Sequence, residues 1–224
     1  MKTLRTQLSK PVELIEWSED SLGTMLWKYP AEQSQIKYGA KLTVRESQYA
    51  FIVAEDNVAD VFKPGLYSLT VENMPRLAIL NKWDKEFHGT ITADIYFFKT
   101  KFFLDQKWKL RKPLMVKDDE FGLVRINLSG LVDIRIVDTE QLLSQLNDNK
   151  KEFTVTEACS IVEGIILSKF PSVITNKKFS VIKPTPYDEE LWGLAQEEVN
   201  NELEKFGLEA ANLKFKATAL GSEN

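Results

Sequence analysis

The clearest pattern in the chain is an alternation of apolar and polar residues over positions 122–136, which read GLVRINLSGLVDIRI. The even-numbered positions are mainly Val, Ile and Leu, and most charged and polar residues occupy odd-numbered positions. Successive side chains of a strand point to opposite faces, so the pattern predicts one long strand with an apolar and a polar face. One polar face favours an antiparallel sheet. A strand of this length usually bends, and Gly130 is the expected site of a bulge or kink.

Residues 48–70 have the pattern of shorter strands joined by turns. The apolar runs 48–54 and 58–62 are separated by Glu-Asp-Asn, which predicts a β-hairpin. Pro64 and Gly65 predict a second turn, because proline presets φ and glycine accepts a positive φ. A strand is expected to follow. Residues 91–98 alternate again and predict a further strand.

Helices are expected after residue 138, where the spacing of apolar residues changes. Asp138 with Gln141 and Thr154 with Glu157 have the spacing of capping boxes, which mark helix starts. The second of these helices carries apolar residues on one side. It is expected to end at Pro171, because proline disrupts the backbone hydrogen bonds of a helix.

A third helix is expected to begin after Pro186, with three acidic residues in its first turn. Its apolar stripe ends shortly before Gly207, which is placed as a C-terminal cap. Alternation over 213–217 predicts a last strand. Strands followed by helices indicate an α+β fold, in which helices pack on an antiparallel sheet.

Composition narrows the class of protein. The chain has 224 residues, of which 43% are hydrophobic and 28% are charged, as in globular proteins with a buried core. The net charge of −4 argues against a general nucleic-acid-binding protein, which needs a basic surface. The N-terminal sequence does not resemble a signal peptide, and no apolar run approaches the roughly 18 residues of a membrane span. Any membrane contact is therefore expected to be peripheral or made through a partner.

Candidate catalytic chemistry is sparse. His88 and Cys159 are the single histidine and cysteine, too few for a triad of the usual kind or a typical zinc site. Cys159 lies within an amphipathic helical pattern, which predicts a buried thiol. Asp118, Asp119 and Glu120 form a carboxylate cluster that suits either a solvated turn or an acid–base or metal site. We expect no catalytic residue, metal or cofactor, and the alternative is an enzyme or ligand-binding domain with a carboxylate-lined cleft at this cluster.

One local segment is strongly basic. Residues 97–112, FFKTKFFLDQKWKLRK, contain six basic residues and one acidic residue. Cations interleaved with aromatic residues suit an anionic lipid surface or a single-stranded nucleic acid. The other interpretation is a strand and loop with core aromatics and solvated lysines, and both remain open. The candidate membrane or partner contact comprises Lys107, Trp108, Lys109, Arg111 and Lys112.

Several stretches jointly resemble the stomatin–prohibitin–flotillin (SPFH, band 7) superfamily. They are VRESQYAFIVAEDNVADVFKPGLYSL, PLMVKDDEFGLVRINLSGLVDIRIVDTEQLL and ELWGLAQEEVNNELEKFGLEAANLKFKA. LIEWSEDSLGTMLWKYP, TVENMPRL and ADIYFFKTKFF resemble a soluble bacterial subgroup described as virion-core-protein-like. The resemblance covers about residues 12–218 as one domain, which leaves residues 1–11 and 219–224 as tails.

The resemblance implies a curved antiparallel sheet with helices packed on it, and a scaffold rather than an enzyme. Such a scaffold forms homo-oligomers and organises partner proteins at membranes, without nucleic acid or cofactors. For the subgroup it implies a cytoplasmic protein at the inner face of the bacterial membrane, linked to envelope stress. The sequence departs from stomatins in lacking their N-terminal apolar anchor. It ends where longer relatives continue into helical or zinc-ribbon tails, as a fragment of a longer protein would.

Overall fold

The computed structural model describes residues 13–18, 22–31, 35–55, 57–82, 89–118, 121–146, 150–177 and 188–219. These residues form two compact units. Unit 1 comprises Met1–Asp20 and Lys28–Phe97, and unit 2 comprises Ser21–Trp27 and Phe98–Asn224. Antiparallel strand pairs and helices together confirm the α+β class that the sequence predicts.

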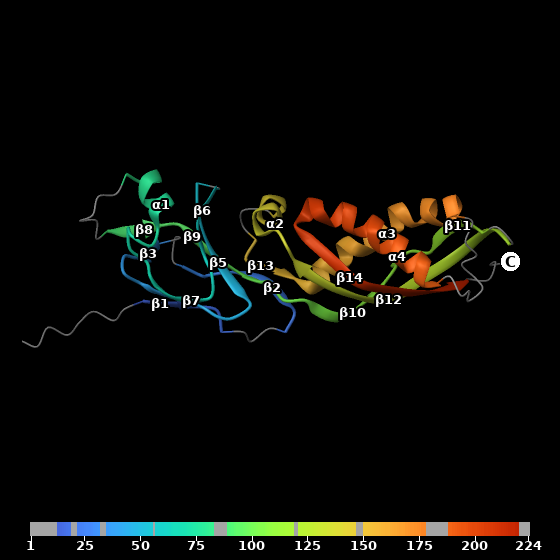
Figure 1. Cartoon of the computed structure of the whole chain (residues 1–224), viewed down its shortest axis with the longest axis horizontal. Coiled ribbons are helices and arrows are strands. Elements are labelled where there is room, and N and C mark those ends of the chain that lie inside the picture. The colour runs from blue at the N-terminus through green and yellow to red at the C-terminus, as the bar shows by residue number, and fades with distance from the viewer. Residues whose placement is uncertain are drawn as a thin grey trace, which may run out of the picture. The chain divides into compact units, whose positions relative to one another are not determined.

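Unit 1 is built mainly from short strands (Figure 1). β1 (Leu14–Glu16) pairs in parallel with β4 (Lys41–Val44), and β7 (Gly65–Ser68) pairs antiparallel with the same strand. The apolar residues Ile15 and Leu42 alternate with exposed or half-buried neighbours and are fully buried. This sheet therefore follows the period-two pattern of its sequence.

The remaining strands of unit 1 correct one prediction and confirm another. β3 (Gln35–Lys37) pairs with β8 (Thr90–Thr92) in a separate two-stranded sheet. Three strands lie side by side in the order β9 (Asp94–Lys99), β5 (Gln48–Ala54) and β6 (Asn57–Phe62). β5 and β6 form the predicted hairpin. The single strand predicted over 91–98 is wrong, because the chain changes sheets at Ala93 between β8 and β9.

A short helix, α1 (Pro75–Leu80), is anchored to β6 by a buried carboxylate. Asp60 is 7% exposed and accepts hydrogen bonds from the backbone nitrogens of Arg76 at 3.2 Å and Leu77 at 2.9 Å. The first amides of a helix have no partner within the helix, so this carboxylate supplies one. The Asp60 carboxylate therefore serves as a hydrogen-bond acceptor within unit 1.

Unit 2 is organised around β12 (Gly122–Ile136), which has the bounds of the predicted long strand. β11 (Leu114–Asp118) and β10 (Phe103–Lys109) pair with one edge of β12, and β14 (Leu208–Ala219) pairs with the other, all antiparallel. The even-numbered apolar residues Ile126, Leu128, Val132 and Ile134 are fully buried, as the alternation predicts. The shorter strands β2 (Thr24–Lys28) and β13 (Glu152–Thr154) pair with each other.

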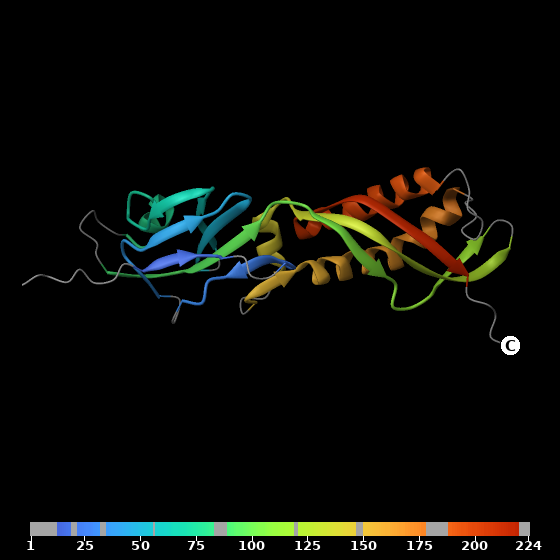
Figure 2. The same ribbon diagram turned by 90° about the horizontal axis from the view of Figure 1, so that it is seen from below.

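Helices cover one face of this sheet. α3 (Val155–Lys177) contacts β10, β11 and β12, and α4 (Asp188–Leu203) contacts β14 and α3. Figures 1 and 2 show both helices running along the sheet. Asp138 is the N-cap of α2 (Thr139–Gln145), and its carboxylate accepts a hydrogen bond from the Gln141 backbone nitrogen at 2.9 Å. The short 3-10 helix η2 (Glu204–Phe206) follows α4.

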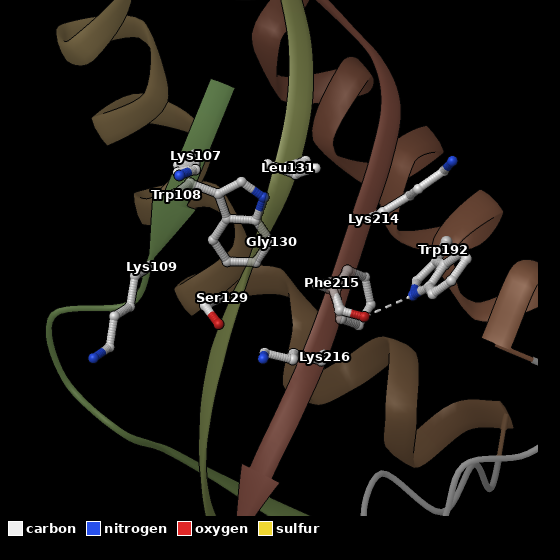
Figure 3. A pocket seen from close by; sticks show the side chains of 10 residues that line it. All are labelled: Lys107, Trp108, Lys109, Ser129, Gly130, Leu131, Trp192, Lys214, Phe215 and Lys216. Carbon is white, nitrogen blue, oxygen red and sulfur yellow. Dashed lines mark hydrogen bonds between the residues drawn. The ribbon is translucent and has the colours of Figure 1, made fainter. Parts of the chain in front are cut away.

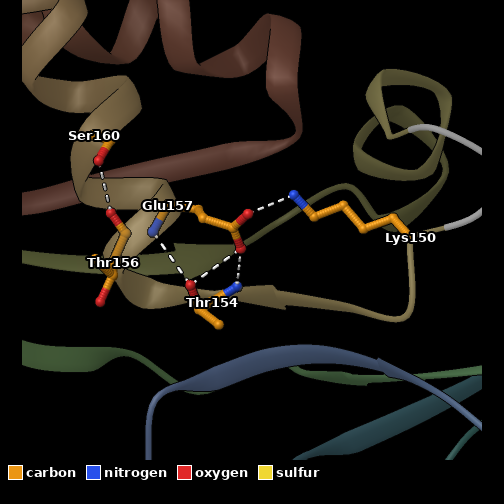
Figure 4. Close-up of polar contacts among 5 residues, drawn as sticks. All are labelled: Lys150, Thr154, Thr156, Glu157 and Ser160. Atoms are coloured by element: carbon orange, nitrogen blue, oxygen red, sulfur yellow. Dashed lines mark hydrogen bonds and ion pairs between the residues drawn. The ribbon is translucent and has the colours of Figure 1, made fainter.

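The start of α3 is a complete capping box (Figure 4). Thr154 Oγ1 accepts a hydrogen bond from the Glu157 backbone nitrogen at 3.3 Å, and Glu157 Oε2 accepts one from the Thr154 backbone nitrogen at 2.8 Å. Burial tends to raise the pKa of Glu157, but hydrogen bonds from Lys150 and Thr154 lower it below its usual value. The reciprocal bonds fix the first turn of α3.

The prediction that Pro171 ends this helix is wrong, because α3 continues to Lys177 with the proline inside it. Phe170 and Ile174 lie on the buried side of α3, at 2% and 0% exposure. Burial of apolar side chains before and after Pro171 offsets the backbone hydrogen bond that the proline removes.

The residues expected at turns occupy three kinds of position. Pro64 is exposed just before β7, and Gly65 begins β7. Gly207 caps η2 with φ of 66°, where a Cβ atom would lie 2.0 Å from the Asp138 carbonyl oxygen. Glycine is therefore required there for both conformation and space. Gly130 lies in β12, but the register with β14 shifts between Leu131 and Asp133 rather than at Gly130.

Side chains of α4 hydrogen-bond to the backbone of β14. The side chains of Trp192 and Asn200 donate hydrogen bonds to carbonyl oxygens of β14. Those of Gln196 and Asn200 accept hydrogen bonds from backbone nitrogens of β14. The donor–acceptor distances are 2.8–3.1 Å. The three pairs are Trp192 with Phe215, Gln196 with Leu213 and Asn200 with Ala210. Because the three α4 residues recur every four positions, they lie on one side of the helix. Among the described strands β14 pairs only with β12, so this α4 ladder satisfies backbone groups of an edge strand.

Candidate functional site

The sheet face of unit 2 that points away from α3 and α4 carries a set of cations. The odd-numbered residues of β12 and their cross-strand partners lie on this face. Its exposed cations, here called the basic face, are Lys107, Lys109, Lys117, Arg125, Lys214 and Lys216. They come from four strands, so the fold gathers charges that are far apart in the sequence.

Carboxylates of the same strands lie at the margins of the basic face. Asp133 is 7% exposed and accepts hydrogen bonds from the Asp105 backbone nitrogen and the Asn212 side chain, both at 2.7 Å. Glu209 pairs with Arg135 at 2.6 Å. Asp133 and Glu209 are therefore engaged with neighbours near the end of β12.

Four of the cations border an open groove of about 580 Å³ (Figure 3). The strand register arranges them in two cross-strand rows, Lys107–Leu131–Lys214 and Lys109–Ser129–Lys216. Neighbouring strands lie about 4.8 Å apart, so the lysines of β10 and β14 form two columns roughly 10 Å apart. Within a column, residues two apart on a strand are separated by roughly 7 Å.

Trp108, Phe215 and Trp192 are also among the residues that line the groove, and Trp108 and Phe215 alternate to the covered side of their strands. Gly130 lies between Trp108 and Phe215 in the register, and the Trp108 and Phe215 ring centroids are 6.2 Å apart. A Cβ atom at Gly130 would lie 1.8 Å from the Lys214 carbonyl oxygen, so only glycine allows β14 to approach this closely. Trp192 contributes a third ring, 6.4 Å from that of Phe215.

The structure separates the residues of the predicted contact segment. Lys107 and Lys109 lie on the basic face, whereas Trp108 is only 3% exposed because it alternates to the covered face. This burial does not agree with Trp108 as a residue of the candidate membrane or partner contact. Arg111 approaches α3, with its guanidinium 3.9 Å from the Glu163 carboxylate, and Lys112 is exposed in the following turn.

Sequence reasoning missed the two lysines of β14. Lys214 and Lys216 alternate with apolar residues in the last strand, and this alternation was the available signal. Their position beside Lys107 and Lys109 depends on the pairing of β10 and β14 with opposite edges of β12. A contact between segments about 100 positions apart cannot be derived from spacing alone.

The other candidate residues do not form a site in the part of the chain that is described. Asp118 is 1% exposed and accepts a hydrogen bond from the Phe121 backbone nitrogen at 3.0 Å, whereas Asp119, Glu120 and His88 lie outside the described residues. Burial raises the pKa of the Cys159 thiol to about 11, which disfavours the reactive thiolate. Within the described ranges, no three His, Cys, Asp or Glu side chains are grouped so that they could hold a metal ion.

None of the helices in the described residues is long and apolar enough to cross a membrane.

Comparison with known proteins identifies the family. Residues 26–223 match the family described as SPFH domain-Band 7 family, so the match includes residues of both units and all strands of the basic face. Among curated proteins, none matches the chain. Proteins of this family are generally membrane-associated scaffolds. The match covers far more than half of the sequence, and the chain therefore belongs to the SPFH domain-Band 7 family.

Proposed function

We propose that this chain is a non-enzymatic scaffold domain that assembles into homo-oligomers and holds partner proteins at the inner face of the bacterial membrane. In this proposal it is a cytoplasmic protein that contacts the membrane peripherally and acts in envelope stress. The observation that carries the proposal is the basic face, with six exposed cations on a sheet face that α3 and α4 leave open. The general character of the family supports the scaffold role.

The distribution of charge supports contact with an anionic lipid surface. Each Lys or Arg near such a surface contributes about 1 kcal/mol to binding. The chain as a whole has a net charge of −4, so an acidic membrane attracts the basic face and repels the remaining surface. Exposed carboxylates on α4, including Glu190, Glu197 and Glu198, belong to a helix that covers the opposite side of the sheet. This segregation of charge favours one orientation on the membrane.

Two other functions receive less support. An enzyme or ligand-binding domain with a carboxylate-lined cleft would need Asp118 to face a cleft, yet its side chain is 1% exposed. Four lysines line the groove, and none of its described lining residues is a carboxylate. A single-stranded nucleic acid would need exposed rings for base stacking, and Trp108 is 3% exposed.

A vesicle co-sedimentation assay tests the membrane contact. We expect the protein to sediment with acidic vesicles at low salt and to remain in solution with neutral vesicles. Binding should weaken at high salt, because the Debye length falls from about 10 Å at 0.1 M to about 3 Å at 1 M. Protein that stays in the supernatant with acidic vesicles at low salt contradicts the proposed lipid contact. Affinity purification from the native cells, with the membrane fraction kept, identifies the partner proteins.

A further inference from the structure

The groove in the basic face has a more specific geometry than a diffuse charged surface. We propose that it binds the headgroup of a lipid that carries two phosphate groups, with one phosphate at each lysine column. The inference rests on the proposed membrane contact and names the class of lipid that the contact prefers.

The lysine columns suit two separate anions. Lys107 and Lys109 on β10 form one column, and Lys214 and Lys216 on β14 form the other. The ammonium groups of one column, roughly 7 Å apart at their backbones, can converge on one phosphate because lysine side chains are long and flexible. The two columns lie roughly 10 Å apart, a span that two phosphates joined by a short linker can bridge. A headgroup with one phosphate leaves one column without a partner.

The space between the columns suits the neutral part of such a headgroup. Ser129 offers a hydroxyl group in one row, and Leu131, which is 36% exposed, offers apolar surface in the other. Gly130 lies between the two rows and presents no side chain to the groove. The volume of about 580 Å³ falls within the range of roughly 300–1,000 Å³ that is typical of ligand sites. The exposed surface of Leu131 favours a lipid, which has an apolar part to bury, over a soluble diphosphate, which has none.

The same face contains a matched control. Lys117 and Arg125 are exposed on β11 and β12 but do not line the groove. Changing Lys107→Gln with Lys214→Gln removes two charges, one from each column. Changing Lys117→Gln with Arg125→Gln removes two charges from the same face and leaves the columns intact. A diffuse charge effect therefore predicts equal losses for the two double variants, whereas a groove site predicts different losses.

The experiment compares two kinds of vesicle with equal surface charge, one containing a single-phosphate anionic lipid and the other a lipid with two phosphates. We expect the unmodified chain to bind the diphosphate vesicles roughly tenfold more tightly. The Lys107 and Lys214 double variant should lose this preference, and the Lys117 and Arg125 double variant should keep it. Both double variants should weaken similarly on single-phosphate vesicles, because each removes two charges.

The outcomes separate this inference from the proposed function. Equal binding of the unmodified chain to both vesicles, or equal loss of preference in both variants, overturns the diphosphate site and leaves the membrane contact standing. Absence of binding to either vesicle overturns both. Binding of an acidic amphipathic peptide that depends on Lys107 and Lys214, without vesicle binding, assigns the groove to a protein partner instead. Circular dichroism of each variant establishes that the fold is retained.

Discussion

The two faces of the unit 2 sheet are made by the same strands and differ in what they contribute. On β12, Ile126, Val132 and Ile134 are fully buried under the helices, while Arg125 and Leu131 alternate to the open side. The pleat alone produces this division, because neighbouring side chains point in opposite directions. The covered face buries the apolar surface that stabilises the fold, and the open face carries the exposed cations. Substitutions on the two faces should therefore change different properties.

The largest expected effect comes from the covered side. Leu203 on α4 is fully buried, so Leu203→Ala should lower the free energy of unfolding by about 2–5 kcal/mol. Glu197→Ala, at an exposed position of the same helix, should change it by less than about 0.5 kcal/mol. Urea denaturation of both variants measures the difference. Equal midpoints would show that α4 does not contribute its apolar stripe to the core.

Glu202 is a poor control for this comparison, although it precedes Leu203 on the exposed side. Its carboxylate accepts a hydrogen bond from Lys205 at 2.6 Å and pairs with Lys169 at 2.9 Å. Hydrogen bonds from these two lysines lower the pKa of Glu202 to about 2. A substitution there would disturb contacts between α3, α4 and η2.

Gly130 is the position at which the two faces depend on each other. Gly130→Ala forces β12 and β14 apart, because the new Cβ atom would lie 1.8 Å from the Lys214 carbonyl oxygen. We expect a loss of about 1–3 kcal/mol in unfolding free energy, together with weaker vesicle binding. Gly164→Ala in α3, where no atom lies within 4 Å of the new Cβ, should stabilise by up to about 1 kcal/mol. Thermal denaturation should therefore show a lower midpoint for Gly130→Ala and a higher midpoint for Gly164→Ala. Midpoints that shift in the same direction would contradict the close approach of β14 to Gly130.

The next effect on the free energy of unfolding is expected from the α4 ladder. Asn200→Ala leaves the Ala210 backbone nitrogen and carbonyl without their side-chain partner and should cost about 1–3 kcal/mol. Asn200→Asp keeps an acceptor for the Ala210 nitrogen and should cost less. Hydrogen exchange at the Ala210 amide measures the contact directly. Unchanged exchange in Asn200→Ala would exclude a stabilising role for this hydrogen bond.

The smallest effect on stability is expected on the open face. Lys107→Gln with Lys214→Gln should change the free energy of unfolding by less than about 0.5 kcal/mol, because both side chains are exposed. The same variant should bind acidic vesicles roughly 30-fold more weakly, from about 1 kcal/mol for each cation. A loss of stability comparable to that of Leu203→Ala would show that the two faces are not separable.

Local patterns in the sequence predicted those parts of unit 2 that depend on neighbouring residues. The bounds of β12, the Thr154–Glu157 capping box and the cap at Gly207 each follow from residues a few positions apart. The predicted end of α3 at Pro171 was wrong, because tertiary burial of Phe170 and Ile174 outweighs the local helix-breaking effect of the proline. The strand change at Ala93 was missed for a similar reason, since β8 and β9 have different distant partners.

Local sequence patterns identified only part of the candidate site. Lys107 and Lys109 were identified from local charge, and Trp108 was included because periodicity does not reveal which face of an isolated strand is covered. Once β10 pairs with β12, the register places Trp108 with Gly130 on the covered side. The second lysine column could not be found without the pairing of β14 with β12.

The α4 ladder has a consequence for how this protein can evolve. Trp192, Gln196 and Asn200 hold β14 by its peptide groups and not by the identity of its side chains. Mutations at Lys214 or Lys216 therefore leave these attachments unchanged, and the outward residues of the strand can diverge freely. One inherited framework can in this way present different surfaces in different descendants, and recognition can change from lineage to lineage while the fold persists.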